Sequence, residues 1–175
     1  MNDLRDKVFG RIISVENFPK PGISFKDITG VLSDAEAFRY VVSKMADVVA
    51  DGAIDKVVGI EARGFILGSA IALDAYAGLI LIRKDGKLPR PVFSSEYSLE
   101  YGKGYLNIHQ ADIKAGDMVV VVDDVLATGG TAFAACKLVE MCGGIVEAFV
   151  CMIEVNGLGG REKLGEYRVE SVFKL

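Results

Sequence analysis

The stretch Val119-Val-Val-Val-Asp-Asp-Val-Leu-Ala-Thr-Gly-Gly-Thr131 indicates the fold. Its four leading valines are typical of a strand buried on both faces of a parallel sheet. An acidic pair follows, and then a small turn containing glycine at the start of a helical pattern. In open α/β sheets, ligands bind beyond the carboxyl ends of the strands, where this acidic pair and turn would lie.

The turn, residues 128–131, suits a phosphate group because it offers unpaired backbone N–H groups, two hydroxyls and glycines that admit a ligand. Asp123 and Asp124 would accept hydrogen bonds from neutral hydroxyls and would repel phosphate. Together these features indicate a sugar phosphate. The alternative is that the aspartates cap the turn and the glycines only tighten it. Neither a G-x-x-x-x-G-K-[ST] loop nor a G-x-G-x-x-G loop after a candidate strand occurs.

Outward from this stretch, short apolar runs alternate with segments of helical spacing, which predicts one α/β domain with a central parallel sheet flanked by helices. A further helix, with apolar residues from Phe38 to Val49, is expected behind a capping box of Ser33 and Glu36. Residues 17–25 are expected to form an extended loop, and residues 83–110 a long connection containing a hairpin of 97–101 and 105–109. The expected strands are 56–60, 79–82, 118–122 and 146–153, and the expected crossover helices are 64–77 and 131–141.

Composition excludes several classes of protein. The chain has 175 residues and a formal net charge of -4, which argues against a protein that binds a nucleic-acid backbone. One histidine and three cysteines, none in a C-x-x-C spacing, argue against zinc-finger and thioredoxin-like sites. His109 is interpreted as a strand histidine rather than a catalytic one. The N-terminus lacks the apolar segment of a secretory signal, and residues 64–82 are interpreted as a helix and a strand divided by Gly78, so we expect a cytoplasmic protein without a membrane span.

The segment from Val119 to Thr131 resembles the phosphoribosyl pyrophosphate motif of the type I phosphoribosyltransferases. Further segments are similar to the adenine phosphoribosyltransferases in particular, in the family's order and over nearly the whole chain. They are Phe18-Pro-Lys-Pro-Gly-Ile-Ser-Phe-Lys-Asp-Ile28, Gly59-Ile-Glu-Ala-Arg-Gly-Phe65, and Ile82-Arg-Lys-Asp-Gly-Lys-Leu-Pro89 with Tyr97-Ser-Leu-Glu-Tyr-Gly102. The resemblance implies the type I fold, with an N-terminal hood of about residues 1–30 and a flexible flap of about residues 84–108 on a single domain, 1–175.

The resemblance implies transfer of the 5-phosphoribosyl group from phosphoribosyl pyrophosphate to N9 of adenine, which yields AMP and pyrophosphate in purine salvage. Mg²⁺ would bind through substrate oxygens and water rather than directly to the protein. A homodimer is implied, without nucleic acid or membrane as a partner. Pyrophosphate would bind to Arg63 near the base and, across the dimer, to Arg83, Lys84 and Lys87. The Glu61–Ala62 peptide bond is expected to be cis.

The remaining roles also come from the resemblance. Glu100 would exchange a proton with N7 of adenine, acting with Arg63 in catalysis, and Tyr101 would pack near the ribose and pyrophosphate. The ribose hydroxyls would bind Asp123 and Asp124. The 5-phosphate would bind to Ala127, Thr128, Gly129, Gly130 and Thr131, and adenine to Ile23, Ser24, Phe25, Lys26, Val125, Leu126 and Val155.

Each of these residues could instead have a purely structural role. Residues 83–87 could be a solvated basic patch, Glu100 an exposed glutamate on a strand, and Phe25 a side chain that fills the core. Ser24 and Lys26 depart from the family, in which an aliphatic residue and an arginine are usual. Two other functions compete. One is transfer to a different base, against which Ala127 counts because 6-oxopurine enzymes usually carry aspartate there. The other is a non-enzymatic sensor of phosphoribosyl pyrophosphate.

Overall fold

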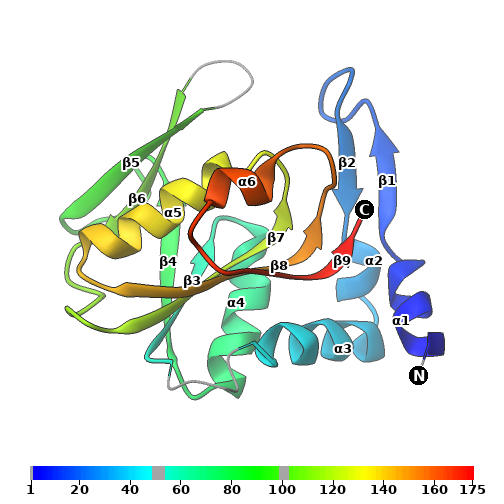
Figure 1. Cartoon of the computed structure of the whole chain (residues 1–175), viewed down its shortest axis with the longest axis horizontal. Coiled ribbons are helices and arrows are strands. Elements are labelled where there is room, and N and C mark those ends of the chain that lie inside the picture. The colour runs from blue at the N-terminus through cyan, green and yellow to red at the C-terminus, as the bar shows by residue number, and fades with distance from the viewer. Residues whose placement is uncertain (1, 49–53, 99–102) are drawn as a thin grey trace. The chain divides into compact units, whose positions relative to one another are not determined.

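The computed structural model describes residues 2–48, 54–98 and 103–175. Its contacts divide the chain into two compact units, Met1–Lys44 and Met45–Leu175. The larger unit contains the sheet that the valine run predicts, and its strands and helices are labelled in Figure 1.

The smaller unit consists of short helices and a hairpin: α1 (Asn2–Phe9), β1 (Ile13–Glu16), β2 (Ser24–Asp27), α2 (Thr29–Leu32) and most of α3 (Ala35–Ala46). The strands pair antiparallel, from Ile13 opposite Asp27 to Glu16 opposite Ser24. The expectation of an extended loop through residue 25 was therefore wrong at its end, where Ser24 and Phe25 lie in β2. This pairing depends on β1, a strand of four exposed residues whose short alternation of Ile, Ser, Val and Glu was not recognised in the sequence.

The expected helix is α3, but its cap differs from the prediction. The backbone N–H of Ala37 donates to Asp34 Oδ1 at 2.9 Å, whereas Ser33 Oγ donates backwards to the carbonyl of Gly30. Asp34 therefore caps the helix in place of Ser33. The two residues are adjacent and both are good capping types, so the spacing of apolar residues could not separate them.

The larger unit has a seven-stranded sheet in the order β5-β6-β4-β3-β7-β8-β9. The strands β4, β3, β7, β8 and β9 are parallel, and β6 and β5 extend the sheet antiparallel. Their bounds are β3 (Lys56–Ile60), β4 (Gly78–Lys84), β5 (Val92–Ser98), β6 (Lys103–His109), β7 (Met118–Leu126), β8 (Ile145–Glu154) and β9 (Val169–Lys174). The predicted central parallel sheet is confirmed, and its inner strands are the apolar runs of the sequence.

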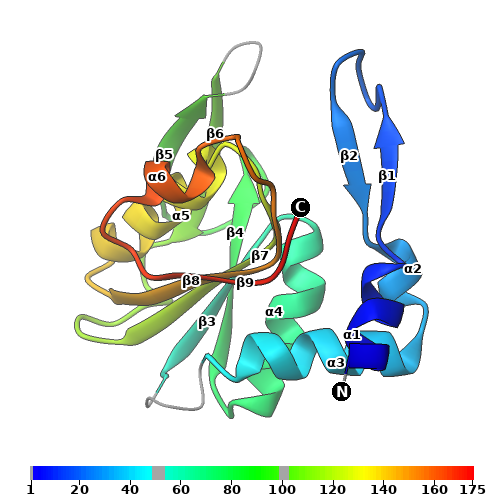
Figure 2. The same ribbon diagram turned by 45° about the vertical axis from the view of Figure 1, so that its right-hand side comes forward.

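Helices α4 (Arg63–Asp74) and α5 (Gly130–Met141) are the crossovers β3-α4-β4 and β7-α5-β8, and α6 (Gly160–Leu164) precedes β9. The two crossovers run in opposite directions along the sheet, so right-handed connections place α4 and α5 on opposite faces, as Figure 2 shows. The strand order thus reverses between β3 and β7. A crevice at such a switch point is where doubly wound sheets bind ligands.

Several bounds differ from the sequence prediction. Strand β7 continues to Leu126, so the acidic pair lies inside the strand rather than after it. Strand β5 begins at Val92 rather than at 97, and β9 and α6 were not predicted. The interpretation of residues 64–82 as a helix and a strand is confirmed by α4 and β4. Among the residues that the structure describes, no helix is long and apolar enough to cross a membrane.

Candidate active site

The carboxyl end of β7 opens into a pocket of about 90 Å³. The chain leaves the strand at Leu126, bends through residues 127–129 and enters α5 at Gly130. Gly129 has φ 80°, in the left-handed region that glycine adopts without a steric penalty. The first N–H groups of a helix have no partner within the helix, and here they border a concave space. The pocket is lined by Asp123, Val125, Leu126, Ala127, Thr128, Gly129, Gly130, Thr131 and Ala132.

Two carboxyl groups and one guanidinium meet beside this pocket. The backbone N–H of Asp124 donates to Asp123 Oδ1 at 2.9 Å, and Arg63 Nε lies 2.6 Å from Asp124 Oδ2. The Asp124 side chain is 5% exposed, and its Oδ2 accepts no hydrogen bond within the described part of the chain. The Arg63 contact is therefore one of charge, and Oδ2 retains capacity to accept a hydrogen bond.

Burial governs the ionisation of both carboxyl groups. It raises the pKa of Asp123 well above its usual range, and the neighbouring Asp124 carboxylate raises it further. Burial also raises the pKa of Asp124, although the Arg63 guanidinium limits that rise. A hydroxyl group of a neutral ligand would supply the hydrogen bond that Asp124 Oδ2 lacks.

Glycine packing fixes the position of Arg63 at the start of α4. A Cβ on Gly64 would lie 2.7 Å from the carbonyl oxygen of Val122, and a Cβ on Gly59 would lie 2.9 Å from that of Gly64. Helix α4 therefore begins in direct backbone contact with β3 and β7. The preceding Glu61–Ala62 peptide bond is cis, as the resemblance led us to expect.

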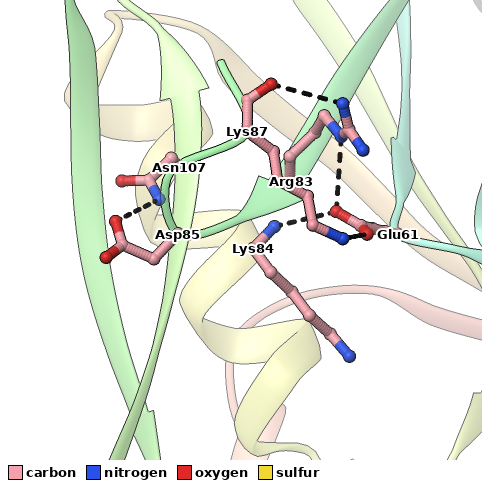
Figure 3. A network of polar contacts seen from close by, with 6 residues as sticks. All are labelled: Glu61, Arg83, Lys84, Asp85, Lys87 and Asn107. Atoms are coloured by element: carbon pink, nitrogen blue, oxygen red, sulfur yellow. Dashed lines mark hydrogen bonds and ion pairs between the residues drawn. The ribbon is translucent and has the colours of Figure 1, made fainter.

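The cations at the end of β4 converge on Glu61 (Figure 3). Arg83 Nε and the backbone N–H of Lys84 donate to Glu61 Oε2 at 3.3 and 3.0 Å, and Lys87 Nζ donates to Oε1. Arg83 Nη1 also donates to the carbonyl of Lys87 at 3.2 Å. The side chain of Lys84 points away from Glu61 in Figure 3, so only its backbone takes part.

The Glu61 side chain is 9% exposed, and these partners favour its charged form. Burial alone would raise the pKa of Glu61, but the hydrogen bonds from Lys87 and the Lys84 N–H, with the two nearby cations, hold it below its usual range. Asn107 on β6 steadies the same turn by donating to Asp85 Oδ1 at 3.3 Å. The Glu61 carboxylate is thus bound by the same groups that the resemblance assigns to pyrophosphate.

The residues expected at the adenine base lie in both units. In the hairpin of the smaller unit, Ser24 Oγ donates to Glu16 Oε1 at 2.6 Å, and Lys26 Nζ donates to the hydroxyls of Ser14 and Ser24. The Phe25 ring packs edge-on against Phe18 at 5.3 Å between centroids, and Ile23 is half-buried just before β2.

In the larger unit, the structure brings together the remaining three residues of that set. The backbone N–H of Val155 donates to the carbonyl of Leu126 at 2.9 Å, and Val125 and Leu126 line the pocket at the end of β7. Glu100 and Tyr101 lie outside the described residues. His109 ends β6 and is 7% exposed, as expected of a strand histidine.

Sequence reasoning missed two side-chain anchors near the site. It treated Glu61 only as part of a peptide bond, although the carboxylate binds Lys87 across 26 positions of sequence. It also passed over Arg161, which follows Gly159 and Gly160 and makes a bidentate pair with Glu154. Paired glycines before a short helix were the available signal, because they often mark a close backbone approach.

Comparison with known proteins agrees with this geometry. Residues 32–172 match the phosphoribosyl transferase domain. An adenine phosphoribosyltransferase of Salinispora tropica is 50% identical over 157 residues, which are 90% of this chain and 84% of the relative. The chain belongs to the adenine phosphoribosyltransferase family.

Solved structures of the family share the fold over the full length of the chain. The adenine phosphoribosyltransferase of Rhodothermus marinus superposes with a TM-score of 0.95 at 42% identity and covers 100% of both chains. That of Saccharomyces cerevisiae, solved with an imino-altritol bisphosphate and adenine, has a TM-score of 0.92 at 32% identity and covers 99% of this chain and 100% of its own. The predicted type I phosphoribosyltransferase fold is thus confirmed.

Proposed function

We propose that this protein transfers the 5-phosphoribosyl group of phosphoribosyl pyrophosphate to N9 of adenine, with release of pyrophosphate, and so forms AMP in purine salvage. The observation that carries the proposal is the pocket at the end of β7, where a helix start and a carboxyl pair lie side by side. The yeast family member binds adenine and a sugar-like bisphosphate, ligands of the same chemical kind.

In this proposal the 5-phosphate binds to residues 127–131, where backbone N–H groups and the hydroxyls of Thr128 and Thr131 serve as donors. The ribose hydroxyls donate to Asp123 and Asp124. Support comes from Asp124 Oδ2, a buried acceptor to which no donor of the described chain makes a hydrogen bond. A bound diol would satisfy this oxygen.

Pyrophosphate is proposed to bind Arg63 and, across the interface of a homodimer, Arg83, Lys84 and Lys87, of which Lys87 is the main candidate to serve the neighbouring site. The present partner of Arg83 and Lys87 is the Glu61 carboxylate, which supports the idea that this turn is built for an anion. Arg63 also lies between the carboxyl pair and the cis peptide bond, at the place where C1 of the ribose would react.

Magnesium enters the proposal as part of the substrate. No group of three or more His, Cys, Asp or Glu residues in the described part of the chain is placed to hold a metal ion. We propose that Mg²⁺ arrives bound to pyrophosphate and ribose oxygens and keeps water ligands, as this ion commonly does with phosphate substrates.

The adenine base is proposed to bind Ile23, Ser24, Phe25, Lys26, Val125, Leu126 and Val155. Glu100 accepts the N7 proton of adenine as the N9 lone pair forms the bond to C1, and the pyrophosphate oxygen leaves C1 with the electron pair of the broken bond. Tyr101 packs beside the ribose and the departing pyrophosphate. The hood of about residues 1–30 and the flap of about residues 84–108, parts of one domain in this proposal, exclude water from the reacting atoms.

An exposed apolar surface on α4 and β4 supports the proposed homodimer. Leu73 is 82% exposed and Tyr76, just after the helix, is 99% exposed, and Ile66, Leu79 and Leu81 on the same two elements are also exposed. Several large apolar side chains exposed on two neighbouring elements are consistent with an interface between proteins. We also propose a cytoplasmic enzyme that does not bind nucleic acid, in accord with its net charge of -4.

A turnover assay tests the proposal. The protein is incubated with phosphoribosyl pyrophosphate and either adenine, hypoxanthine or guanine, with and without Mg²⁺, and nucleotide formation is measured by chromatography. We expect AMP from adenine in the presence of Mg²⁺ and little product from the two oxopurines. Preferential use of hypoxanthine or guanine, or ligand binding without any nucleotide formed, would contradict the proposal.

A further inference from the structure

The loop proposed to bind the 5-phosphate, residues 127–131 (the phosphate loop), contacts the short helix α6 through two facing glycines. A Cβ on Gly160 would lie 2.2 Å from the carbonyl oxygen of Ala127, and a Cβ on Gly129 would lie 2.6 Å from the carbonyl oxygen of Gly160. Neither position has room for a side chain, so the two backbones are in direct contact. Any displacement of the first turn of α6 must therefore be transmitted to residues 127–129.

Helix α6 depends on side-chain anchors for its position, because a helix of 5 residues is not stable by itself. Arg161, next to Gly160, supplies the anchors. Its Nε and Nη2 donate to Glu154 Oε1 and Oε2 at 2.8 and 2.6 Å, and its Nη1 donates to the carbonyl of Val169 at 2.9 Å. The guanidinium thus ties the start of α6 to the end of β8 and to the first residue of β9.

Glu154 connects Arg161 to the strand that leads into the phosphate loop. It is the last residue of β8 and pairs in register with Leu126, the last residue of β7, and the next N–H, that of Val155, donates to the Leu126 carbonyl. Its carboxylate also accepts a hydrogen bond from Ser171 Oγ at 2.9 Å. A closed ring runs from Leu126 through Glu154, Arg161 and Gly160 back to Ala127.

We propose that Arg161 and Glu154 are positioning residues for the 5-phosphate: they touch no substrate, but they hold α6 against the loop and so fix its N–H groups. The inference rests on the proposed function, in which this loop binds the 5-phosphate. A bidentate pair suits the task, because it fixes orientation as well as distance. Glu154 is buried at 8% exposure, whereas the Arg161 side chain is 41% exposed, so the pair is anchored on its Glu154 side.

The proposal is tested with Glu154→Gln and Arg161→Lys in the full-length protein. Glutamine keeps the shape of the Glu154 side chain but removes its charge. Lysine keeps the charge of Arg161 but cannot donate two parallel hydrogen bonds to the carboxylate. We expect the KM for phosphoribosyl pyrophosphate and the Kd for ribose 5-phosphate to rise roughly tenfold or more, because displacing a binding group by about 1 Å can cost on the order of 100-fold. The KM for adenine and kcat should change little.

Arg168→Lys is the matched control, because Arg168 lies in the same C-terminal segment and forms exposed ion pairs with Glu170 and Glu147. It should leave both constants unchanged. Ser171→Ala removes one hydrogen bond to Glu154 and leaves the ion pair intact, so it gives a folded variant with a smaller rise in Kd if the charged variants do not fold.

The possible outcomes distinguish a failure of the positioning role from a failure of the proposed 5-phosphate site. If the folded variants melt at a lower temperature but bind ribose 5-phosphate with the wild-type Kd, the pair only stabilises the fold and the positioning role is wrong. If the wild-type protein itself binds no ribose 5-phosphate, the proposed function of the loop fails instead.

Discussion

The buried carboxyl pair at the end of β7 lowers the free energy of unfolding when both groups are ionised. Asp123 and Asp124 are adjacent, and burial raises the pKa of both. A carboxyl group whose pKa is raised in the folded state binds more protons folded than unfolded, between its unfolded and folded pKa values. The free energy of unfolding therefore falls as pH rises through that interval.

Replacement of Asp123 by asparagine should remove this pH-dependent loss. The amide oxygen can still accept the hydrogen bond from the Asp124 N–H, and the charge disappears. We expect Asp123→Asn to raise the free energy of unfolding at pH 7, because the neutral amide carries no charge that burial and the Asp124 carboxylate disfavour. The same variant should bind phosphoribosyl pyrophosphate more weakly. Urea unfolding at several pH values and a binding titration measure the two effects.

Asp74→Asn, at the exposed end of α4, is the control for this experiment and should alter neither quantity. A variant at Asp123 that keeps the wild-type pH dependence of stability would show that this carboxyl group is ionised in the folded protein at no energetic cost.

At the residue scale, the sequence revealed what is local. The acidic pair and the glycines of residues 128–131 occur in one short stretch, and its chemistry can be inferred from residue types alone. The contacts of Glu61 with Lys87 and of Tyr167 with Glu140 join positions 26 and 27 residues apart. Such partners depend on how strands are ordered in the sheet, which residue types do not specify.

Elements approach one another closely where glycines allow it, and the start of α4 is the tightest case near Arg63. A Cβ on Gly68 would lie 3.3 Å from Gly59 Cα, so the helix follows β3 at backbone contact from its first turn onward. The backbone, rather than the Arg63 side chain alone, therefore sets the distance between the guanidinium and the carboxyl pair.

Gly64→Ala tests this packing. The new methyl group would meet the Val122 carbonyl at 2.7 Å and approach Asp123 Oδ1 at 3.1 Å, so α4 must move away from β7. We expect the free energy of unfolding to fall by about 1 to 3 kcal/mol, the usual cost of overpacking. The KM for phosphoribosyl pyrophosphate should rise because Arg63 moves with the helix. Thermal unfolding and steady-state kinetics are the measurements.

Ser69→Ala on the same helix provides the comparison, because Ser69 is exposed and its hydroxyl bonds only within the helix. Unchanged kinetics in a folded Gly64→Ala protein would mean that Arg63 is positioned by its side chain and not by the helix backbone.

At the element scale, burial decided which predictions succeeded. Strands β3 and β8 are almost continuously apolar and buried, and the sequence predicted them nearly to the residue. Strand β9 (Val169–Lys174) mixes polar and apolar residues and is only partly buried along its length. Its existence depends on pairing with β8, so hydrophobic periodicity gave no reliable sign of it.

The whole molecule is acidic, yet its proposed substrate is a polyanion. The chain has 20 Lys and Arg against 24 Asp and Glu residues, so its net charge does not attract phosphate. The proposal therefore depends on local arrangement, in which Arg63 lies beside the pocket and Arg83 and Lys87 both contact the Glu61 carboxylate. At the proposed dimer level, the same arrangement raises the question of which subunit each cation serves.

Mixed dimers answer that question. Lys87→Ala and Arg63→Ala proteins, each with greatly reduced activity, are unfolded together in denaturant, refolded and assayed. If Lys87 serves the neighbouring site, a mixed dimer has one site with both cations, and random pairing should restore about one quarter of wild-type activity. If Lys87 serves its own subunit, each site of a mixed dimer lacks one cation, and activity should stay at the level of the separate variants. Remixing Lys87→Ala with itself controls for the effect of refolding.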